Sequence, residues 1–254
     1  MGSQSMDTKY GPVGAPPSHT GGISAESCPI VELRQYTLHE GERDRLINLF
    51  EQEFIEPQEA LGMKIIGTFY DLDRPNRFVW LRGFQDMDSR LHGLTEFYDG
   101  DVWKAHREIA NATMIDSDNV LLVHALTSAA RFQEKSIGSS QGGRPGVLAA
   151  TIYYLKSAPE DVAPLFEDQV KANLEEAGVP VLAWFVSCKE ANNYPRLPVR
   201  EGEHVLLWFG RFDDWQAYAR MAGVIADAQS PLSAHFTQSP EVVRLAPTER
   251  SELR

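Results

Sequence analysis

One order of secondary-structure elements occurs twice along the 254 residues of this chain. From residue 30, and again from residue 146, hydrophobic periodicity predicts a strand, a helix, two strands, a second helix and a closing strand. A β-α-β-β-α-β order gives a four-stranded antiparallel sheet with its helices on one face. One such sheet leaves its other face bare, and two repeats in one chain can cover each other's bare faces. We therefore predict an α+β fold in which two ferredoxin-like repeats pair their antiparallel sheets into an α+β barrel.

Details of the two repeats support a duplication. The third strand of each repeat has related sequences, "VWLRGF" and "LWFGRF", which place Trp80 opposite Trp208. The first repeat is expected to contain a helix over 41–62 that Pro57 kinks or stops, and a helical region over 86–116 broken near Gly100. In the second repeat, we expect Gly178 to end the first helix as a C-cap.

Two segments without periodicity divide the chain into domains. Residues 1–27 are polar and rich in Gly, Ser and Pro, which predicts a disordered leader, and 131–146 read as a Gly/Ser-rich linker. The first ferredoxin-like domain then covers 28–130, and a second, diverged ferredoxin-like domain covers 147–254.

Charge and motif content argue against several classes of function. The net charge of −12 does not suit a nucleic-acid partner or an anionic membrane surface. No apolar run reaches the roughly 18 residues of a membrane span. Phosphate-loop, nucleophile-elbow and CxxC motifs are missing, and the histidines lack metal-ligand spacing, so we expect no metal and no cofactor. Cys28 and Cys188 do not suggest a disulfide framework, and a cytoplasmic location is expected.

A histidine in the stretch "FYDGDVWKAHRE" is the candidate acid/base group. If residues 101–115 are helical, Trp103, His106 and Met114 share one face, and the imidazole points toward the sheet. A neutral imidazole facing a cavity there can transfer protons near pH 7. The alternative is a core histidine that donates a hydrogen bond to a carbonyl or a carboxylate.

The first strand offers a second set of polar groups. Glu32, Arg34 and Tyr36 lie on one face of it, because side chains alternate along a strand. An arginine and a tyrosine on one face can bind and polarise a carbonyl or phenolate oxygen. The alternative is a buried ion pair between Arg34 and Glu32 or a helix carboxylate, with the tyrosine packed at the barrel interface.

Further residues are expected to bind the substrate in a pocket that mixes aromatic rings with a few polar groups. They are Trp103, Phe97, Phe69, Trp80, Arg82 and Arg90. The repeated tryptophan also fits a packing role, because both repeats must fill the same gap. Arg90 also fits an i,i+4 pair with Asp86 on the same helix.

Residues 30–126 resemble the NIPSNAP family. The resemblance rests on "ELRQY" and "LHEG" in and after the first strand, Gly62 before the second strand, "VWLRGF" as the third, Arg90, and the pair Asp101 and Trp103. It implies a dimeric α+β barrel fold, in tandem or homo-oligomeric form. Proteins of that fold include cofactor-free monooxygenases, isomerases, polyketide cyclases and haem enzymes. The second half has "TIYYL" where the first has "ELRQY", so it is similar by element order more than by motif.

These observations together favour a small-molecule enzyme. We expect it to act on a largely apolar organic substrate without a nucleotide cofactor, as an isomerase, lyase, cyclase or cofactor-free monooxygenase. His106 would be the acid/base, and Arg34 and Tyr36 would hold a developing oxyanion. Two alternatives stay open: a non-catalytic NIPSNAP-like binding or interaction protein, and a barrel that binds haem through His106 or His235. Self-association into a homo-oligomer is also expected, because barrels of this type leave sheet edges that another chain can cover.

Overall fold

The computed structural model describes residues 23–134 and 146–254. Most of the leader predicted over 1–27, and most of the linker predicted over 131–146, lie outside the described residues.

The described elements follow the predicted repeat. The first repeat contains β1 (Ile30–Leu38), α1 (Arg43–Glu53), α2 (Ile55–Ala60), β2 (Lys64–Asp71), β3 (Arg77–Phe84), α3 (Met87–Asp99), α4 (Asp101–Thr113), β4 (Met114–Asp116) and β5 (Val120–His124). The second contains β6 (Val147–Tyr154), α5 (Pro159–Leu165), the π-helical segment η5 (Phe166–Lys171), α6 (Ala172–Glu176), β7 (Val181–Ser187), β8 (Val205–Phe212), α7 (Trp215–Ala228) and β9 (Glu241–Pro247). Short 3-10 turns are η1 (Ala25–Ser27), η2 (Ser128–Ala130) and η6 (Ser230–His235).

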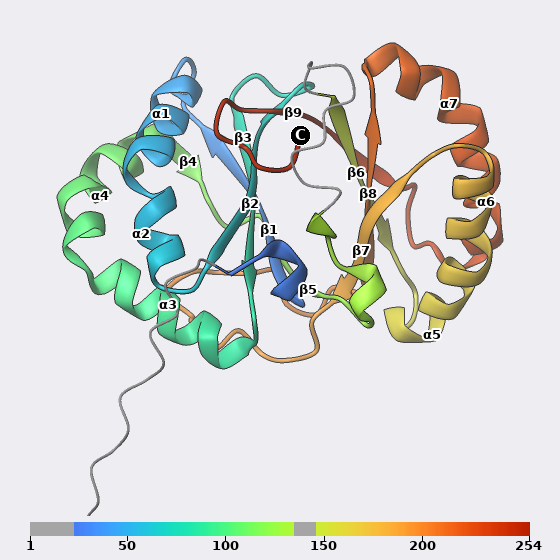
Figure 1. Cartoon of the computed structure of the whole chain (residues 1–254), viewed down its shortest axis with the longest axis horizontal. Coiled ribbons are helices and arrows are strands. Elements are labelled where there is room, and N and C mark those ends of the chain that lie inside the picture. Colours follow the sequence, from blue (N-terminus) through green and yellow to red (C-terminus); the bar gives the residue numbers. More distant parts are fainter. Residues whose placement is uncertain (1–22, 135–145) are drawn as a thin grey trace, which may run out of the picture.

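The strands close into an antiparallel barrel, as predicted (Figure 1). Within the described residues, nine strands form one sheet, and the pairing of β3 with β1 closes eight of them, leaving β4 beside β1. The first repeat has the strand order β2-β3-β1-β5 and the second has β7-β8-β6-β9, so both share one ferredoxin-like order. The repeats meet at two seams, β2 with β9 and β5 with β7.

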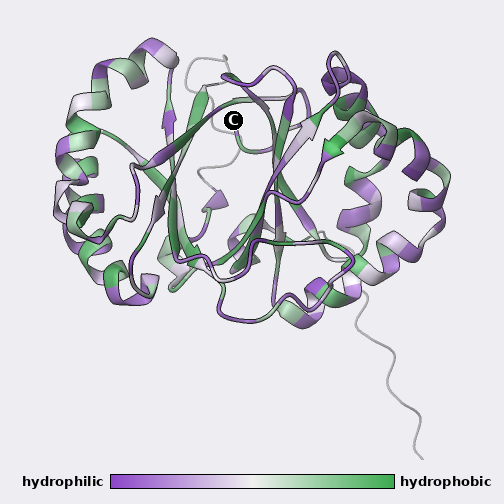
Figure 2. Ribbon diagram, turned by 180° about the vertical axis from the view of Figure 1, so that it is seen from behind, coloured by the Kyte–Doolittle hydropathy of each residue, from purple (hydrophilic) through white to green (hydrophobic). Residues whose placement is uncertain are grey.

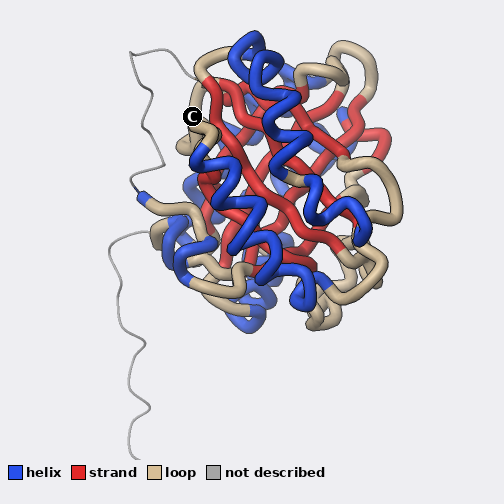
Figure 3. The backbone as a smooth tube through the Cα atoms, turned by 90° about the vertical axis from the view of Figure 1, so that its right-hand side faces the viewer, coloured by secondary structure: helices blue, strands red, loops and turns tan. Residues whose placement is uncertain are grey.

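The helices of each repeat cover the outer face of its own sheet (Figures 1 and 3). The alternation of β1 divides its side chains between two layers. Val31 and Leu33 belong to the apolar core that the two repeats share, whereas Tyr36 belongs to a second core beneath α1 to α4. Hydrophobic residues are concentrated along the strands, and polar residues are most frequent on the helices and loops (Figure 2). The polar face of β1 therefore lies between the sheet and the helices of the first repeat.

Two helix boundaries in the first repeat differ from the prediction. The helix expected over 41–62 is interrupted at Phe54, and Pro57 lies in the first turn of α2, where its missing N–H is tolerated. The helical region expected over 86–116 ends at Thr113, because Met114 begins β4 and pairs with β1. The break near Gly100 is confirmed, and a Cβ at that position would lie 2.7 Å from the carbonyl oxygen of Glu96.

The second repeat contains one feature that the sequence did not predict. Its first helix changes to a π-helical segment over Phe166–Lys171 before α6 begins. Gly178 has a φ of +82° directly after the helix, which confirms its role as the C-terminal cap.

Among the described helices, none is long and apolar enough to cross a membrane.

Strand register identifies equivalent positions in the two repeats. Trp80 lies opposite Arg34, and Trp208 lies opposite Thr151. Arg34 therefore corresponds to Thr151. By the same registers, Glu32 corresponds to Ala149, Tyr36 to Tyr153 and Arg82 to Gly210.

Candidate functional site

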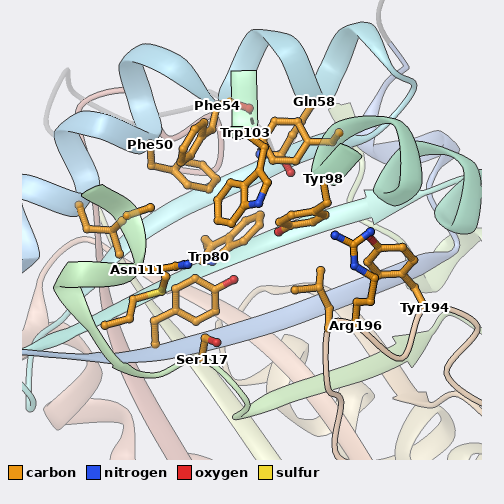
Figure 4. Close-up of a pocket in the computed structure, with 16 residues that line it drawn as sticks. Phe50, Phe54, Gln58, Trp80, Tyr98, Trp103, Asn111, Ser117, Tyr194 and Arg196 are labelled. Carbon is orange, nitrogen blue, oxygen red and sulfur yellow. Dashed lines mark hydrogen bonds between the residues drawn. The ribbon is translucent and has the colours of Figure 1, made fainter. Parts of the chain in front are cut away.

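A cavity of about 270 Å³ lies between the sheet and the helices of the first repeat (Figure 4). Its walls come from β1 and β3, from α1 to α4, from Met114 and Ser117 just beyond α4, and from the loop 188–204 that joins β7 to β8. Half of the residues that line it are aromatic. Phe50 packs on Trp80 with ring centroids 4.6 Å apart, and Trp103 contacts Phe54 at 5.7 Å. Such a lining suits a flat, largely apolar organic molecule.

One wall of this cavity belongs to the second repeat. Tyr194, from the loop 188–204, stacks against Tyr98 of α3 with ring centroids 6.1 Å apart. Arg196 of the same loop donates a hydrogen bond to Asp99 at 2.7 Å. Both loop residues line the cavity. The site in the first repeat is therefore completed by a segment from the second.

A cluster of buried charges lies beside the cavity. The carboxylate of Glu32 faces three guanidinium groups, which belong to Arg34, Arg82 and Arg90. The nitrogen–oxygen distances are 2.9 Å for Arg34, 2.7 Å for Arg82 and 2.7 Å for Arg90. All four side chains are fully buried. We call these four residues the Glu32 cluster.

Neutral side-chain amides accept hydrogen bonds from two of the arginines. Arg82 donates to Gln58 Oε1 at 2.7 Å. Arg90 donates to Asn193 Oδ1 at 2.6 Å and to Asn192 Oδ1 at 3.1 Å, and both asparagines lie on the loop 188–204. These amides supply dipoles and no charge, so the Glu32 cluster contains one negative and three positive groups.

Arg34 joins the Glu32 cluster to the cavity wall. Its Nε donates to the hydroxyl of Tyr36 at 2.9 Å, and Tyr36 lines the cavity. Since that hydroxyl accepts from Arg34, its own proton is free to be donated, and no acceptor for it is found in the described part of the chain. Nη2 of Arg34 is buried and likewise has no hydrogen-bond partner there.

The protonation states follow from burial and from these contacts. Burial acts to raise the pKa of Glu32, but the guanidiniums of Arg82, Arg34 and Arg90 outweigh it and hold that pKa well below its usual range. Burial also raises the pKa of Tyr36, and the neighbouring guanidinium of Arg34 only partly opposes the rise. Glu32 is thus ionised and Tyr36 is a neutral phenol at pH 7, which makes Tyr36 a hydrogen-bond donor.

The predicted aromatic residues separate into two groups. Trp103, Phe97 and Trp80 line the cavity with Tyr36. Phe69 lies in the apolar core that the two repeats share and does not reach the cavity. Its alternation on β2 directs it to the other face of the sheet.

The predicted charged residues lie apart from His106. Arg34, Arg82 and Arg90 gather around Glu32, so the buried ion pair considered as the alternative for Arg34 is present. The expected i,i+4 pairing of Arg90 with Asp86 is absent among the described contacts, since the guanidinium of Arg90 binds Glu32 and Asp86 caps α3.

His106 is not positioned as the sequence predicted. Its imidazole is 28% exposed, its Nε2 lies 3.4 Å from Glu53 Oε2, and it does not line the cavity. Its ring contacts that of Phe54, which lines the cavity, with ring centroids 6.1 Å apart. The geometry therefore favours Tyr36 over His106 as the group that meets a ligand.

Sequence reasoning missed several lining residues. Phe50, Phe54 and Tyr98 belong to apolar helix faces, where a buried ring in a core looks the same as a ring on a cavity wall. Tyr194 and Arg196 lie in a proline-containing loop of the other repeat, and no local pattern connects that loop to the first repeat.

The equivalent place in the second repeat has different chemistry. Trp208 donates through Nε1 to the hydroxyl of Tyr153 at 2.9 Å, and this hydroxyl lies 3.1 Å from Gln229 Oε1, to which it donates. By contrast, Nε1 of Trp80 is buried without a partner in the described residues. Ala149, Thr151 and Gly210 replace three charged members of the Glu32 cluster. The Glu32 cluster therefore has no counterpart at the equivalent positions of the second repeat.

The residues present do not fit a haem ligand set. None of the described histidines lines the cavity, and His106 is engaged with Glu53 at the surface. His235 ends the turn η6 in the second repeat. Over the described ranges, no group of three or more His, Cys, Asp and Glu side chains is arranged to hold a metal ion.

The fold and site define a class of protein, an α+β barrel built from two fused ferredoxin-like repeats with a small-molecule-sized cavity under the helices of one of them. Solved structures share this fold over most of the chain. An anthrone oxidase-like protein has a TM-score of 0.55 at 13% identity, covering 89% of this chain and 94% of its own. A proposed monooxygenase from Lactobacillus acidophilus NCFM has 0.54 at 14%, covering 87% and 94%. A mutant form of chlorite dismutase from Candidatus Nitrospira defluvii has 0.51 at 10%, covering 87% and 92%.

The family match is confined to the first half of the chain. Residues 31–128 match the model of the NIPSNAP family, so the first repeat is similar to NIPSNAP domains, as its motifs predicted. No curated protein matches the chain significantly.

Proposed function

We propose that this protein is an enzyme that converts a small, largely apolar organic molecule in the cavity of the first repeat, without a nucleotide cofactor. The observation that carries the proposal is the Tyr36–Arg34 pair at an aromatic cavity, with a 2.9 Å hydrogen bond that leaves the phenolic proton free. The fold shared with an anthrone oxidase-like protein and a proposed monooxygenase supports a small-molecule enzyme. A cytoplasmic location and a homo-oligomeric state belong to the same proposal.

The chemistry follows from the protonation states. A neutral Tyr36 donates its proton in a hydrogen bond to a carbonyl or phenolic oxygen of the substrate. When water takes a proton from the carbon next to a carbonyl, or from the hydroxyl of a phenol, negative charge develops on that oxygen. The phenol holds this charge by its hydrogen bond, and the buried Arg34 guanidinium, which donates to the phenol, stabilises it. Isomerisation, lyase, cyclisation and cofactor-free oxygenation reactions can all pass through such an enolate or phenolate.

A binding protein without turnover is the second candidate. One observation favours it: apart from tyrosines and Arg196, the described lining of the cavity contains no titratable side chain. A base for the carbon-bound proton would then have to be the substrate itself or water. The experiment must therefore distinguish binding from conversion.

Proton exchange on a simple ketone tests the proposal. 2-Tetralone is an aromatic ketone with acidic carbon-bound protons, and its exchange in D₂O is followed by NMR. The wild-type protein is expected to accelerate exchange, and Tyr36→Phe to reduce that acceleration about 10²- to 10³-fold, the usual loss for one oxyanion donor. Tyr153→Phe is the matched control, because it removes the equivalent hydroxyl of the second repeat. Binding of the ketone without accelerated exchange would favour the binding protein, and equal losses in both variants would exclude a specific role for Tyr36.

A further inference from the structure

We infer that the cavity of the first repeat selects an anionic ligand, namely an aromatic or alicyclic molecule that carries an oxyanion such as a carboxylate or an ionised phenol. The inference rests on the proposed function, because it names the substrate class of the same site. It adds one chemical preference to that proposal: among molecules of the same shape, the cavity binds the one that already carries a negative charge more tightly.

The first observation is an uncompensated charge. In the Glu32 cluster one carboxylate faces the guanidiniums of Arg34, Arg82 and Arg90, and none of these side chains is exposed to solvent. The remaining partners in this cluster are amides and a phenol, which carry no charge. Two positive charges are therefore left over in a buried place. Buried charges are normally paired, because removing an ion from water without a counter-ion is costly.

The second observation is a set of unused hydrogen-bond donors around the same cavity. Nη2 of Arg34, Nε1 of Trp80 and the hydroxyl of Tyr194 are buried and lack partners in the described residues. Their residues are 0%, 1% and 5% exposed. Trp80 and Tyr194 both line the cavity (Figure 4). Arg34 does not line it, but donates a hydrogen bond to Tyr36, which does. Buried donors are rarely left unsatisfied, so unused donors gathered at one place favour a ligand that is rich in hydrogen-bond acceptors.

The third observation concerns the sign of the charges around the cavity. The chain has a net charge of −12, yet the cavity lining contains no aspartate or glutamate. Asp99, which approaches the lining through Arg196, is already bound to that guanidinium. A positive site enclosed in a negative protein admits an anion and disfavours a cation of the same shape.

Glu32 also fixes the positions of these arginines. It contacts all three guanidiniums and neutralises one of the three positive charges, so the potential of the cluster stays positive. The second repeat serves as an internal comparison. It lacks the charged residues at Ala149, Thr151 and Gly210, and the indole N–H of Trp208 is already donated to Tyr153.

Two ligands of the same shape test the inference. 2-Naphthoate is an anion at pH 7.5, and 2-naphthamide is its neutral analogue. Quenching of tryptophan fluorescence and isothermal calorimetry would measure both dissociation constants on the full chain. We expect 2-naphthoate to bind at least 10-fold more tightly than 2-naphthamide. Trp80→Phe, which removes the unused indole N–H and keeps a ring, should weaken 2-naphthoate several-fold and leave 2-naphthamide unchanged.

A charge variant and its control complete the test. Arg34→Met removes one of the two surplus positive charges and should reduce the preference for 2-naphthoate several-fold while 2-naphthamide still binds, whereas Arg244→Met, which removes a cation bound to Asp73 at the surface, should keep it. Equal affinities of the wild-type protein for the two probes would overturn the inference and leave the proposed function intact. Failure of both probes to bind would overturn the proposed function with it. If Arg34→Met does not fold, the comparison of the two probes on the wild-type protein still decides.

Discussion

Removal of the Glu32 carboxylate is expected to be among the most damaging single changes in the first repeat. Glu32→Gln preserves the shape of the side chain and deletes the negative charge that three buried guanidiniums share, at distances of 2.7 to 2.9 Å. Loss of one partner from a buried ion pair costs about 3 to 5 kcal/mol. Because three cations depend on this one carboxylate, we expect the upper part of that range. At about 2 to 4 °C per kcal/mol for a chain of this size, the whole range corresponds to a fall in Tm of about 6 to 20 °C.

Removal of one of the three positive charges, in place of the negative one, is the matched comparison. Arg34→Met leaves Glu32 paired with Arg82 and Arg90 and lowers the surplus of positive charge, so it should change the free energy of unfolding by about 1 kcal/mol or less. Glu53→Gln, at a half-exposed carboxylate, controls for charge removal at the surface and should have a smaller effect still.

The assay is urea unfolding followed by tryptophan fluorescence, with the slope m checked for each variant. An ordinary ion pair would lose similar stability from either partner, whereas a positively unbalanced cluster should lose far more from its only acid. The reasoning is refuted if Glu32→Gln lies within about 1 kcal/mol of wild type, or if Arg34→Met costs as much.

The described contacts give three further predictions. The folded pKa of Glu32 lies well below its unfolded value of about 4.3, so its stabilisation is complete above about pH 5 and is lost as pH falls; urea midpoints from pH 7 to 3.5 should decline less in Glu32→Gln than in wild type. His106→Ala should lower the free energy of unfolding by less than about 1 kcal/mol and leave the affinity for 2-naphthoate unchanged, because the imidazole and Glu53 are 28% and 43% exposed. A several-fold loss of affinity would instead show that His106 takes part in ligand binding. Asp86→Ala removes the N-cap of α3, whose carboxylate accepts from the Ser89 backbone N–H and hydroxyl at 2.7 and 2.6 Å, and should lower the unfolding free energy by about 1 kcal/mol in calorimetry; no loss would mean that the cap is replaced by water.

The barrel was predictable because each of its strands has a strong local pattern. Strand alternation and the second appearance of one element order identified every strand of the closed barrel, including the common face of Glu32, Arg34 and Tyr36. The short strand β4 escaped prediction, because Met114 continues the apolar spacing of α4 and only its pairing with β1 ends the helix. The local sequence pattern at Met114 favours helix, and strand pairing with β1 overrides it.

The site was less predictable, and His106 shows why. Trp103 and His106 are three residues apart, which separates their directions by about 60° around a helix. That difference is enough to place Trp103 on the cavity wall and His106 beside Glu53. A sequence pattern defines a helix face only to about this width, so it cannot decide which of two neighbouring side chains reaches a ligand.

Only part of the Glu32 cluster could be predicted from the sequence. Charged residues at alternate positions of a strand with apolar neighbours indicate a buried polar layer, and this identified Arg34 and Glu32. The approach of Arg90 from α3, and of Asn192 and Asn193 from the second repeat, depends on how distant elements pack.

Because the loop 188–204 completes the cavity, the site of the first repeat depends on the second repeat. A gene fragment that ended before the second repeat would encode the Glu32 cluster beside the cavity without Tyr194, Arg196 and the asparagines that bind Arg90. In an assembly of identical repeats, each copy would have to keep both the Glu32 cluster and the loop. Fusion removes that constraint, since one copy can keep the charges while the other keeps the loop. The different residues of the second repeat at Ala149, Thr151 and Gly210 are what such a division of labour leaves behind.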